Sequence, residues 1–211
     1  MSICFIEPHY LPSLAYFKAI SQYDIIGIDI GSKFIKQTYR NRCRVLLSNK
    51  IGQLVIPIRN NSLGGSLSDV KIDYSEKWNH VHWKTIQSAY GKTPFFEHYR
   101  PYFEIIYTNP PVFLVEFILE HLKLCFKLLG WNKQILLIKE SDDKREMVDL
   151  KNIVHSKKSK FRFYSKVYYQ AFGEDFIENL SIIDTLFNVG PESSELVMTS
   201  ELIMTNPSPK S

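Results

Sequence analysis

The chain has 211 residues, of which 45% are hydrophobic and 14% aromatic, which predicts one packed globular domain and argues against a disordered protein. Its formal net charge of +4 is too small to indicate a nucleic-acid-binding protein. Three widely spaced cysteines, Cys4, Cys43 and Cys125, fit reduced thiols and a cytoplasmic protein better than a disulfide framework, and no pair of them has zinc spacing.

The N-terminal residues predict a parallel βαβ unit. Ile3–Ile6 has the pattern of a strand, residues 14–23 that of a helix, and Ile25–Asp29 that of a buried strand ending in an acid. Pro12 suits the first turn of the intervening helix. A strand, a helix and a second strand within about thirty residues are typical of an α/β fold with a parallel sheet.

The rest of the chain continues this alternation. Strands are predicted over residues 42–47, 53–58 and 134–138, helices over 76–90, 96–107, 110–129 and 181–189, a charge-rich loop over 139–160, and an extended segment over 167–172. The most apolar helix carries Glu116, Glu120, Lys123 and Lys127 on one stripe, so it is amphipathic or buried and does not predict a membrane span. We therefore expect a single α/β domain over residues 1–192, with a mostly parallel, Rossmann-like sheet flanked by helices, and a polar tail over 193–211.

The positive charge is concentrated near the N-terminus. No Asp or Glu occurs from Gly31 to Ser68, a window that holds Lys36, Arg40 and Arg42. Arg40, Arg42 and Arg44 would project from one face of a strand that began at Arg40, and three guanidiniums on one face repel each other unless an anion or buried carboxylates lie against them. The pattern indicates an anion site for a phosphate or carboxylate group; the alternative is a solvated basic strand that protects a sheet edge.

Two histidines are candidates for proton transfer. His9 and Tyr10 follow the first strand, and ligands of open α/β sheets bind beyond the carboxyl ends of strands. The alternative is a His and a Tyr that pack the loop. His82 shares a predicted helix face with Trp78, Thr85 and Ala89, so it points to the core or to a cleft, and a core histidine bonded to a backbone carbonyl is its alternative.

Several motifs are absent from the sequence. It has no Walker loop, no GxGxxG, no HExxH and no GxSxG, so it identifies no cofactor and no metal site.

An ordered set of motifs resembles a known family. The set consists of Ile6–Pro12, Tyr16-Phe17, Lys36–Arg44, Trp78 with His82–Ile86, Ala89-Tyr90, Pro94–Phe96, Asn179–Asp184, Leu186–Asn188 and Gly190-Pro191. In this order and spacing the motifs resemble the WbqC-like family from residue 3 to about 192. The family's start usually has Gln where this chain has Glu7, and Trp where it has Ser13.

The resemblance implies a bacterial context, the biosynthesis of surface polysaccharide such as O-antigen, and an acyl- or aminoacyl-transferase acting on a nucleotide- or carrier-linked sugar. It moves the following residues toward function: His82, Arg40, Asn41, Arg42, Tyr10 and Asn179. We predict His9 or His82 as the general base, and substrate binding by Tyr10, Lys36, Arg40, Asn41, Arg42 and Asn179. The expected partner is a phosphate-bearing small molecule or nucleotide sugar. A non-catalytic module that binds a phosphorylated metabolite or a partner protein through its basic face is the alternative, and the sequence does not determine the oligomeric state.

Overall fold

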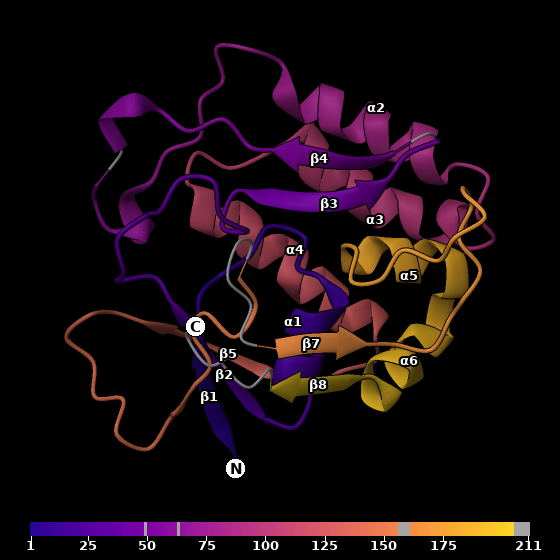
Figure 1. Ribbon diagram of the computed structural model, residues 1–211. Helices are drawn as coiled ribbons and strands as arrows, with labels where there is room; N and C mark the ends of the chain where they lie inside the picture. The colour runs from indigo at the N-terminus through magenta and orange to yellow at the C-terminus, as the bar shows by residue number, and fades with distance from the viewer. Residues whose placement is uncertain (49, 63, 156–160, 205–211) are drawn as a thin grey trace, which may run out of the picture.

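The computed structural model describes residues 1–48, 50–62, 64–155 and 161–204. A four-stranded parallel sheet is flanked by helices in one compact unit, with two antiparallel strand pairs beside it (Figure 1). The predicted single α/β domain with a mostly parallel sheet is therefore confirmed. The helices are α1 (Leu14–Ile20), α2 (Trp78–Tyr90), α3 (Phe96–Thr108), α4 (Leu114–Leu128), α5 (Ile182–Val189) and α6 (Ser193–Thr199). The strands are β1 (Ile3–Ile6), β2 (Ile25–Asp29), β3 (Arg42–Leu46), β4 (Ile51–Val55), β5 (Gln134–Ile138), β6 (Val148–Asp149), β7 (Phe161–Tyr164) and β8 (Glu201–Met204).

The parallel sheet has the strand order β5-β2-β1-β6. β1 and β2 pair in parallel from Ile3 opposite Ile25 to Ile6 opposite Ile28, and α1 connects them. The predicted βαβ unit is confirmed. β6 is a two-residue strand within the segment predicted to be a solvated loop; it pairs with β1, which gives that strand a neighbour on its other edge. Residues 156–160 of the predicted loop lie outside the described residues.

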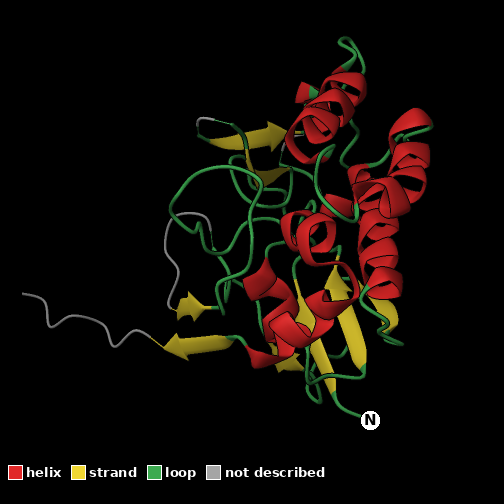
Figure 2. Ribbon diagram, turned by 90° about the vertical axis from the view of Figure 1, so that its right-hand side faces the viewer, coloured by secondary structure: helices red, strands yellow, loops and turns green. Residues whose placement is uncertain are grey.

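The helices α2, α3 and α4 form a layer beside the β3–β4 hairpin (Figure 2). Glu116, Glu120, Lys123 and Lys127 are all exposed on α4, while its other face is buried, so the predicted amphipathic stripe is confirmed. Pro101 lies inside α3, and Phe103 and Tyr107 of the same helix are buried in the core.

Several predicted boundaries are wrong. The hairpin pairs Arg42 with Val55 and Leu46 with Ile51, so β4 begins two residues earlier than predicted and ends before Pro57, which lacks the N–H that strand pairing needs. Arg40 lies in a turn before β3 and not on the strand. The helix expected from residue 110 begins only at Leu114.

The C-terminal part also differs from its prediction. α5 begins after Ser181, whose side chain accepts a hydrogen bond from the Ile183 N–H and so caps the helix that is predicted over 181–189. The expected extended segment over 167–172 is not a strand. Residues 193–204, expected to belong to the polar tail, form α6 and β8, because Val197 is buried in the core and β8 pairs with β7. Residues 205–211 lie outside the described residues.

Gly31 lies where the backbone after β2 passes close to the backbone after β5. A Cβ at this residue would lie 2.3 Å from the Glu140 nitrogen, whereas one at Gly65 would meet nothing nearer than 3.7 Å. We expect Gly31→Ala to lower the free energy of unfolding in urea by about 1–3 kcal/mol, because a backbone must shift, and Gly65→Ala to leave it nearly unchanged. Equal stability of the two variants would show that the approach at Gly31 is not tight.

Candidate functional site

Two acidic residues lie side by side at the carboxyl edge of the parallel sheet. Asp29 is the last residue of β2, and Glu7 directly follows β1. Because Ile6 pairs with Ile28, the next residues along, Glu7 and Asp29, are brought together on neighbouring strands that are about 4.8 Å apart. Both side chains are buried. This edge is where α/β sheets place their ligands.

His9 packs against Glu7 on the same loop. The His9 Nε2 atom lies 3.6 Å from Oε1 of Glu7, and the ring contacts those of Tyr16 and Tyr39, with centroids 4.8 and 5.4 Å away. His9 is only 3% exposed. Its Nδ1 atom is buried and has no hydrogen-bond partner among the described residues. One ring nitrogen is thus turned to a carboxylate and the other is available.

Glu7 is ionised in this setting. Burial raises the pKa of its carboxyl. The contact with His9 and the backbone N–H groups together lower this pKa by more than burial raises it, so the pKa lies below its ordinary value. The Asn152 N–H donates to both carboxylate oxygens at 3.1 Å from a left-handed backbone conformation, φ 61°. A backbone N–H of the segment after β6 therefore holds the Glu7 carboxylate in place.

Arg40 completes the group from the turn before β3. Its side chain is 7% exposed, and its buried Nε atom has no hydrogen-bond partner among the described residues. Burial lowers the pKa of Arg40, while the charges of Glu7 and Asp29 raise it. Burial likewise lowers the pKa of His9 and outweighs Glu7, and the charge of Arg40 lowers it further, so His9 is the neutral base. Glu7, His9, Asp29 and Arg40 are called the carboxyl-edge cluster below.

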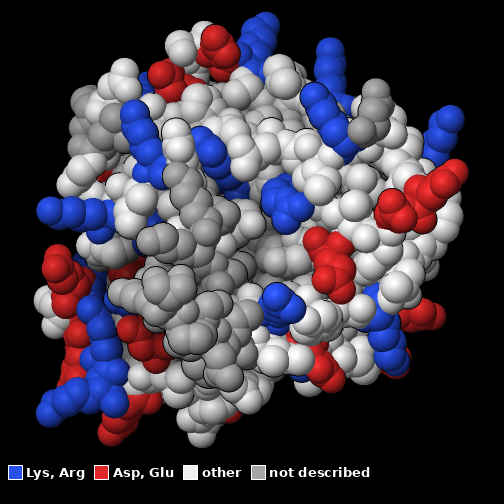
Figure 3. All heavy atoms as spheres, in the orientation of Figure 1, with Lys and Arg blue, Asp and Glu red and all other residues white. Residues whose placement is uncertain are grey.

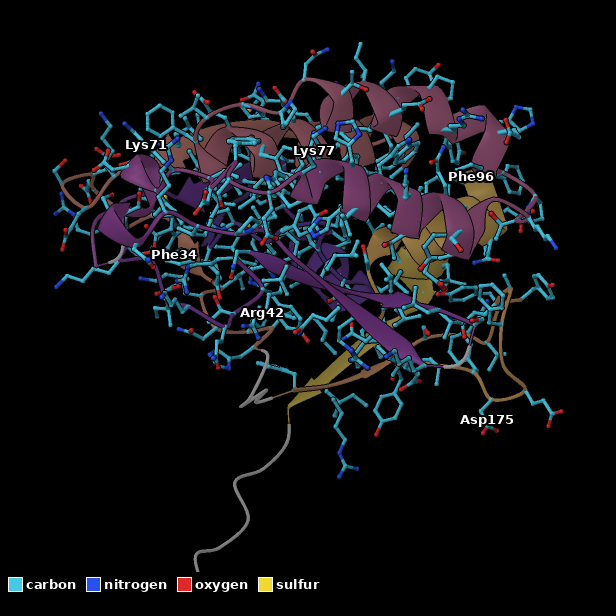
Figure 4. All side chains as sticks on the ribbon, turned by 90° about the horizontal axis from the view of Figure 1, so that it is seen from above. Phe34, Arg42, Lys71, Lys77, Phe96 and Asp175 are labelled. Atoms are coloured by element: carbon cyan, nitrogen blue, oxygen red, sulfur yellow. The ribbon has the colours of Figure 1, made fainter. Side chains whose placement is uncertain are left out.

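The other basic residues lie outside this cluster. The prediction of three guanidiniums on one strand face is wrong, because Arg40 precedes β3 and is buried, whereas Arg42 and Arg44 are half-buried on it. Arg42 donates from Nη1 to Gln53 Oε1 at 3.5 Å, at the end of the hairpin remote from Phe96 and Asp175 (Figure 4). Lys36 is exposed. The face of the molecule drawn in Figure 3 is hollowed near its centre, and both basic and acidic side chains lie on the border of this hollow.

The side chains of Asn41 and Asn179 form hydrogen bonds with backbone groups of the protein. Nδ2 of Asn41 donates to the Ile56 carbonyl at 2.9 Å, although its buried Oδ1 has no partner among the described residues. Oδ1 of Asn179 accepts from the Ala15 N–H at 3.0 Å and so caps α1, whose own N-cap residue, Ser13, makes no side-chain bond to the helix.

Tyr10 and His82 lie together in the core, away from the carboxyl-edge cluster. The Tyr10 hydroxyl is 3.0 Å from Nδ1 of His82 and 2.5 Å from the Tyr107 hydroxyl. The His82 ring also contacts that of Trp78, with centroids 5.1 Å apart, and His82 is 5% exposed. These contacts favour the alternative of a core histidine.

The larger described cavities lie elsewhere. One of about 620 Å³ is lined by Ile3, Asp143, Arg145, Glu146 and Met147. Another of about 420 Å³ is lined by Leu47, Ser48, Val81, Lys84, Thr85, Ser88, Ala89 and Phe172. None of these residues belongs to the carboxyl-edge cluster, and none has a buried side-chain polar atom without a partner. We therefore take the cluster, which has two buried polar atoms without partners among the described residues, as the candidate site in preference to these cavities.

Two members of the cluster were missed as candidates in the sequence. Glu7 stood out only as a departure from a motif, and Asp29 only as the end of a strand. The available signal was an acidic residue at the end of each of two strands that pair in parallel. What the sequence did not show is the pairing register that brings them together.

The comparisons with known proteins point to one family. The model of the WbqC-like protein family matches residues 7–160 and 153–196. No curated protein and no solved structure matches the chain. Within the described residues, no helix has the length and apolar character needed to cross a membrane, and no three His, Cys, Asp or Glu side chains are gathered to hold a metal ion.

Acid should destabilise the fold through its buried histidines. Burial lowers the pKa of His82 and of His121 to about 4, against about 6.5 in an unfolded chain. The unfolded state therefore binds more protons between pH 6.5 and 4, and the free energy of unfolding should fall by about 2 kcal/mol per histidine from pH 7 to pH 5.

Urea unfolding at pH 7 and pH 5 tests this expectation. His82→Gln should lose less stability between the two pH values than the wild type, because one titrating group is gone, while the exposed-histidine variant His98→Gln should match the wild type. The same pH dependence in all three proteins would contradict a neutral, buried His82.

Proposed function

This chain belongs to the WbqC-like protein family, and we propose that it is an acyl- or aminoacyl-transferase of bacterial surface-polysaccharide biosynthesis that acts on a nucleotide- or carrier-linked sugar. The observation that carries the proposal is the neutral, buried His9, with one nitrogen beside a carboxylate and the other unpaired. A histidine oriented by a carboxylate is a typical general base.

His9 removes the proton of the attacking group. Glu7 holds the proton of the ring on Nε2, so Nδ1 carries the lone pair that accepts a proton. The carboxylate also stabilises the imidazolium that forms, as an acid does behind the histidine of a catalytic triad. Base catalysis of this kind contributes about 10²–10⁴-fold.

Arg40 supplies the complementary charge. Its unpaired Nε–H is a donor for the oxyanion that develops at the carbonyl oxygen of the acyl group. Lys36 and Arg42, which are more exposed, neutralise phosphates of the nucleotide or carrier, and the unpaired Oδ1 of Asn41 accepts from the substrate. Tyr10, His82 and Asn179 act as positioning residues, since their polar atoms already bond within the protein.

Removal of the His9 imidazole should prevent synthesis of the normal surface polysaccharide. In a strain whose surface polysaccharide is altered by deletion of this protein, His9→Ala should fail to restore the polysaccharide, because the transfer rate falls at least about 100-fold. The exposed-residue control His98→Ala should restore it. Circular dichroism confirms that each variant is folded.

Restoration by both His9→Ala and His82→Ala would rule out catalysis by either histidine. That result would favour the alternative of a non-catalytic module that binds a phosphorylated metabolite or a partner protein through its basic face.

Phosphate binding should depend on Arg42. Arg42→Gln should weaken the binding of a nucleotide sugar such as UDP-glucose about tenfold, equivalent to about 1.5 kcal/mol for a charged hydrogen bond, measured by titration calorimetry. Arg59→Gln is the matched control, since Arg59 belongs to the same basic window but lies exposed beyond the hairpin. Equal affinity of both variants would remove Arg42 from the phosphate site.

A further inference from the structure

A groove runs between α2, the end of the β3–β4 hairpin and the loop over residues 172–177. It is formed by two cavities of about 420 and 320 Å³, which share three lining residues: Leu47, Ser48 and Phe172. In Figure 4, Asp175 of this loop lies beyond the end of the hairpin that is remote from Arg42. Small-molecule sites have volumes of about 300–1,000 Å³, so each cavity has room for a ligand. We call these two cavities the α2 groove.

The helix α2 turns a second, partly apolar face to this groove. Four of its residues line the larger cavity at the i, i+3, i+4, i+7 spacing of one helical face: Val81, Lys84, Thr85 and Ser88. Val81 is 62% exposed, although other faces of α2 are buried in the core. The larger cavity therefore combines an uncovered apolar side chain with an ammonium group and two hydroxyls.

Charged side chains line both cavities without forming ion pairs. Lys84 lines the larger cavity, whereas Glu174, Asp175 and Lys50 line the smaller one. Within the part of the chain that the structure describes, no carboxylate lies within 4.0 Å of the Lys84 ammonium, and no Lys or Arg nitrogen lies within 4.0 Å of the two acids. Asn49, which lies outside the described residues between Ser48 and Lys50, is uncharged. These charges are therefore open to a ligand.

The loop that carries Phe172 is held closed by one glutamine. Gln170 accepts from the Ile177 N–H at 2.9 Å through Oε1 and donates to the Ile177 carbonyl at 3.0 Å through Nε2. The same Nε2 donates to the buried carboxyl of Asp184 at 3.0 Å, which also accepts from the Tyr168 hydroxyl at 2.6 Å. Opening the loop would cost a buried group one of its hydrogen bonds. Phe172 is thus fixed where the two cavities meet.

We propose that the α2 groove binds a sugar phosphate, with the phosphate beside Lys84 and the sugar ring against Phe172. The lysine ammonium attracts a phosphate as a point charge, and the Ser88 hydroxyl on the same helical face adds a donor. The aromatic ring offers a flat apolar surface to one face of a pyranose. The carboxylates of Glu174 and Asp175 accept hydrogen bonds from the sugar hydroxyls.

The α2 groove is separate from the carboxyl-edge cluster. Arg40 of the cluster precedes β3, whereas Leu47 of the groove directly follows it. The five residues of β3 span about 16 Å at about 3.3 Å per residue, so one small ligand does not bridge the two places. The groove is thus a second binding site, and its existence does not depend on the transferase role.

Glucose 6-phosphate, glucose and inorganic phosphate are matched probes, since the first combines the other two. In NMR titrations, glucose 6-phosphate should shift the backbone amide signals of Ser88 and Gly173 saturably, with an affinity at least about tenfold above those of glucose and inorganic phosphate. Lys84→Gln should remove the advantage over glucose, because the phosphate loses its cation. Lys77→Gln should keep it, since Lys77 is exposed at the N-terminal end of α2 and lines neither cavity (Figure 4).

Three results would overturn this proposal: no saturation by glucose 6-phosphate, equal affinity for inorganic phosphate, or the same loss of affinity in both lysine variants. Shifts confined to the amides around His9 and Arg42 would place the ligand at the site proposed for transfer and would also overturn it. The wild-type titration decides between these outcomes even if a variant fails to fold. Failure of the transferase role is detected separately, by restoration of the polysaccharide with His9→Ala.

Discussion

The parallel register of β1 and β2 is the constraint on which the site depends. It places Glu7 and Asp29 on adjacent strands at the same sheet edge, both buried. Two carboxylates so close in a poorly solvated place repel each other, and they are tolerated only where cations and N–H groups lie around them. Arg40 and the Asn152 N–H supply these interactions. They connect the turn before β3 and the segment after β6 to the carboxyl edge of the sheet.

His9 and Tyr10 are neighbours on one loop that take different places in the fold. Being neighbours in sequence, they point in different directions: His9 lies with Glu7, and the fully buried Tyr10 reaches into the helical layer. There its hydroxyl joins α2 to α3 through His82 and Tyr107. The loop is thus anchored by an aromatic core residue directly beside its candidate base, which limits the motion of that base.

The charge of position 7 separates this chain from the usual family motif. A Gln side chain at this position would also bond to His9, but it would neither strengthen the base nor add negative charge. With Glu7, the histidine faces a carboxylate, and this acid is also close enough to Arg40 for its charge to act on the guanidinium.

The sequence by itself determined the βαβ unit and the amphipathic helix α4, because hydrophobic periodicity acts over a few positions. The order of its motifs also indicated the family. The tertiary structure decided that Arg40 is separate from Arg42, because the hairpin register starts the strand two residues later. It also paired His9 with Glu7 and placed His82 in the core. Such groupings depend on strand pairing and packing between residues far apart in the chain, and local patterns carry no information on them.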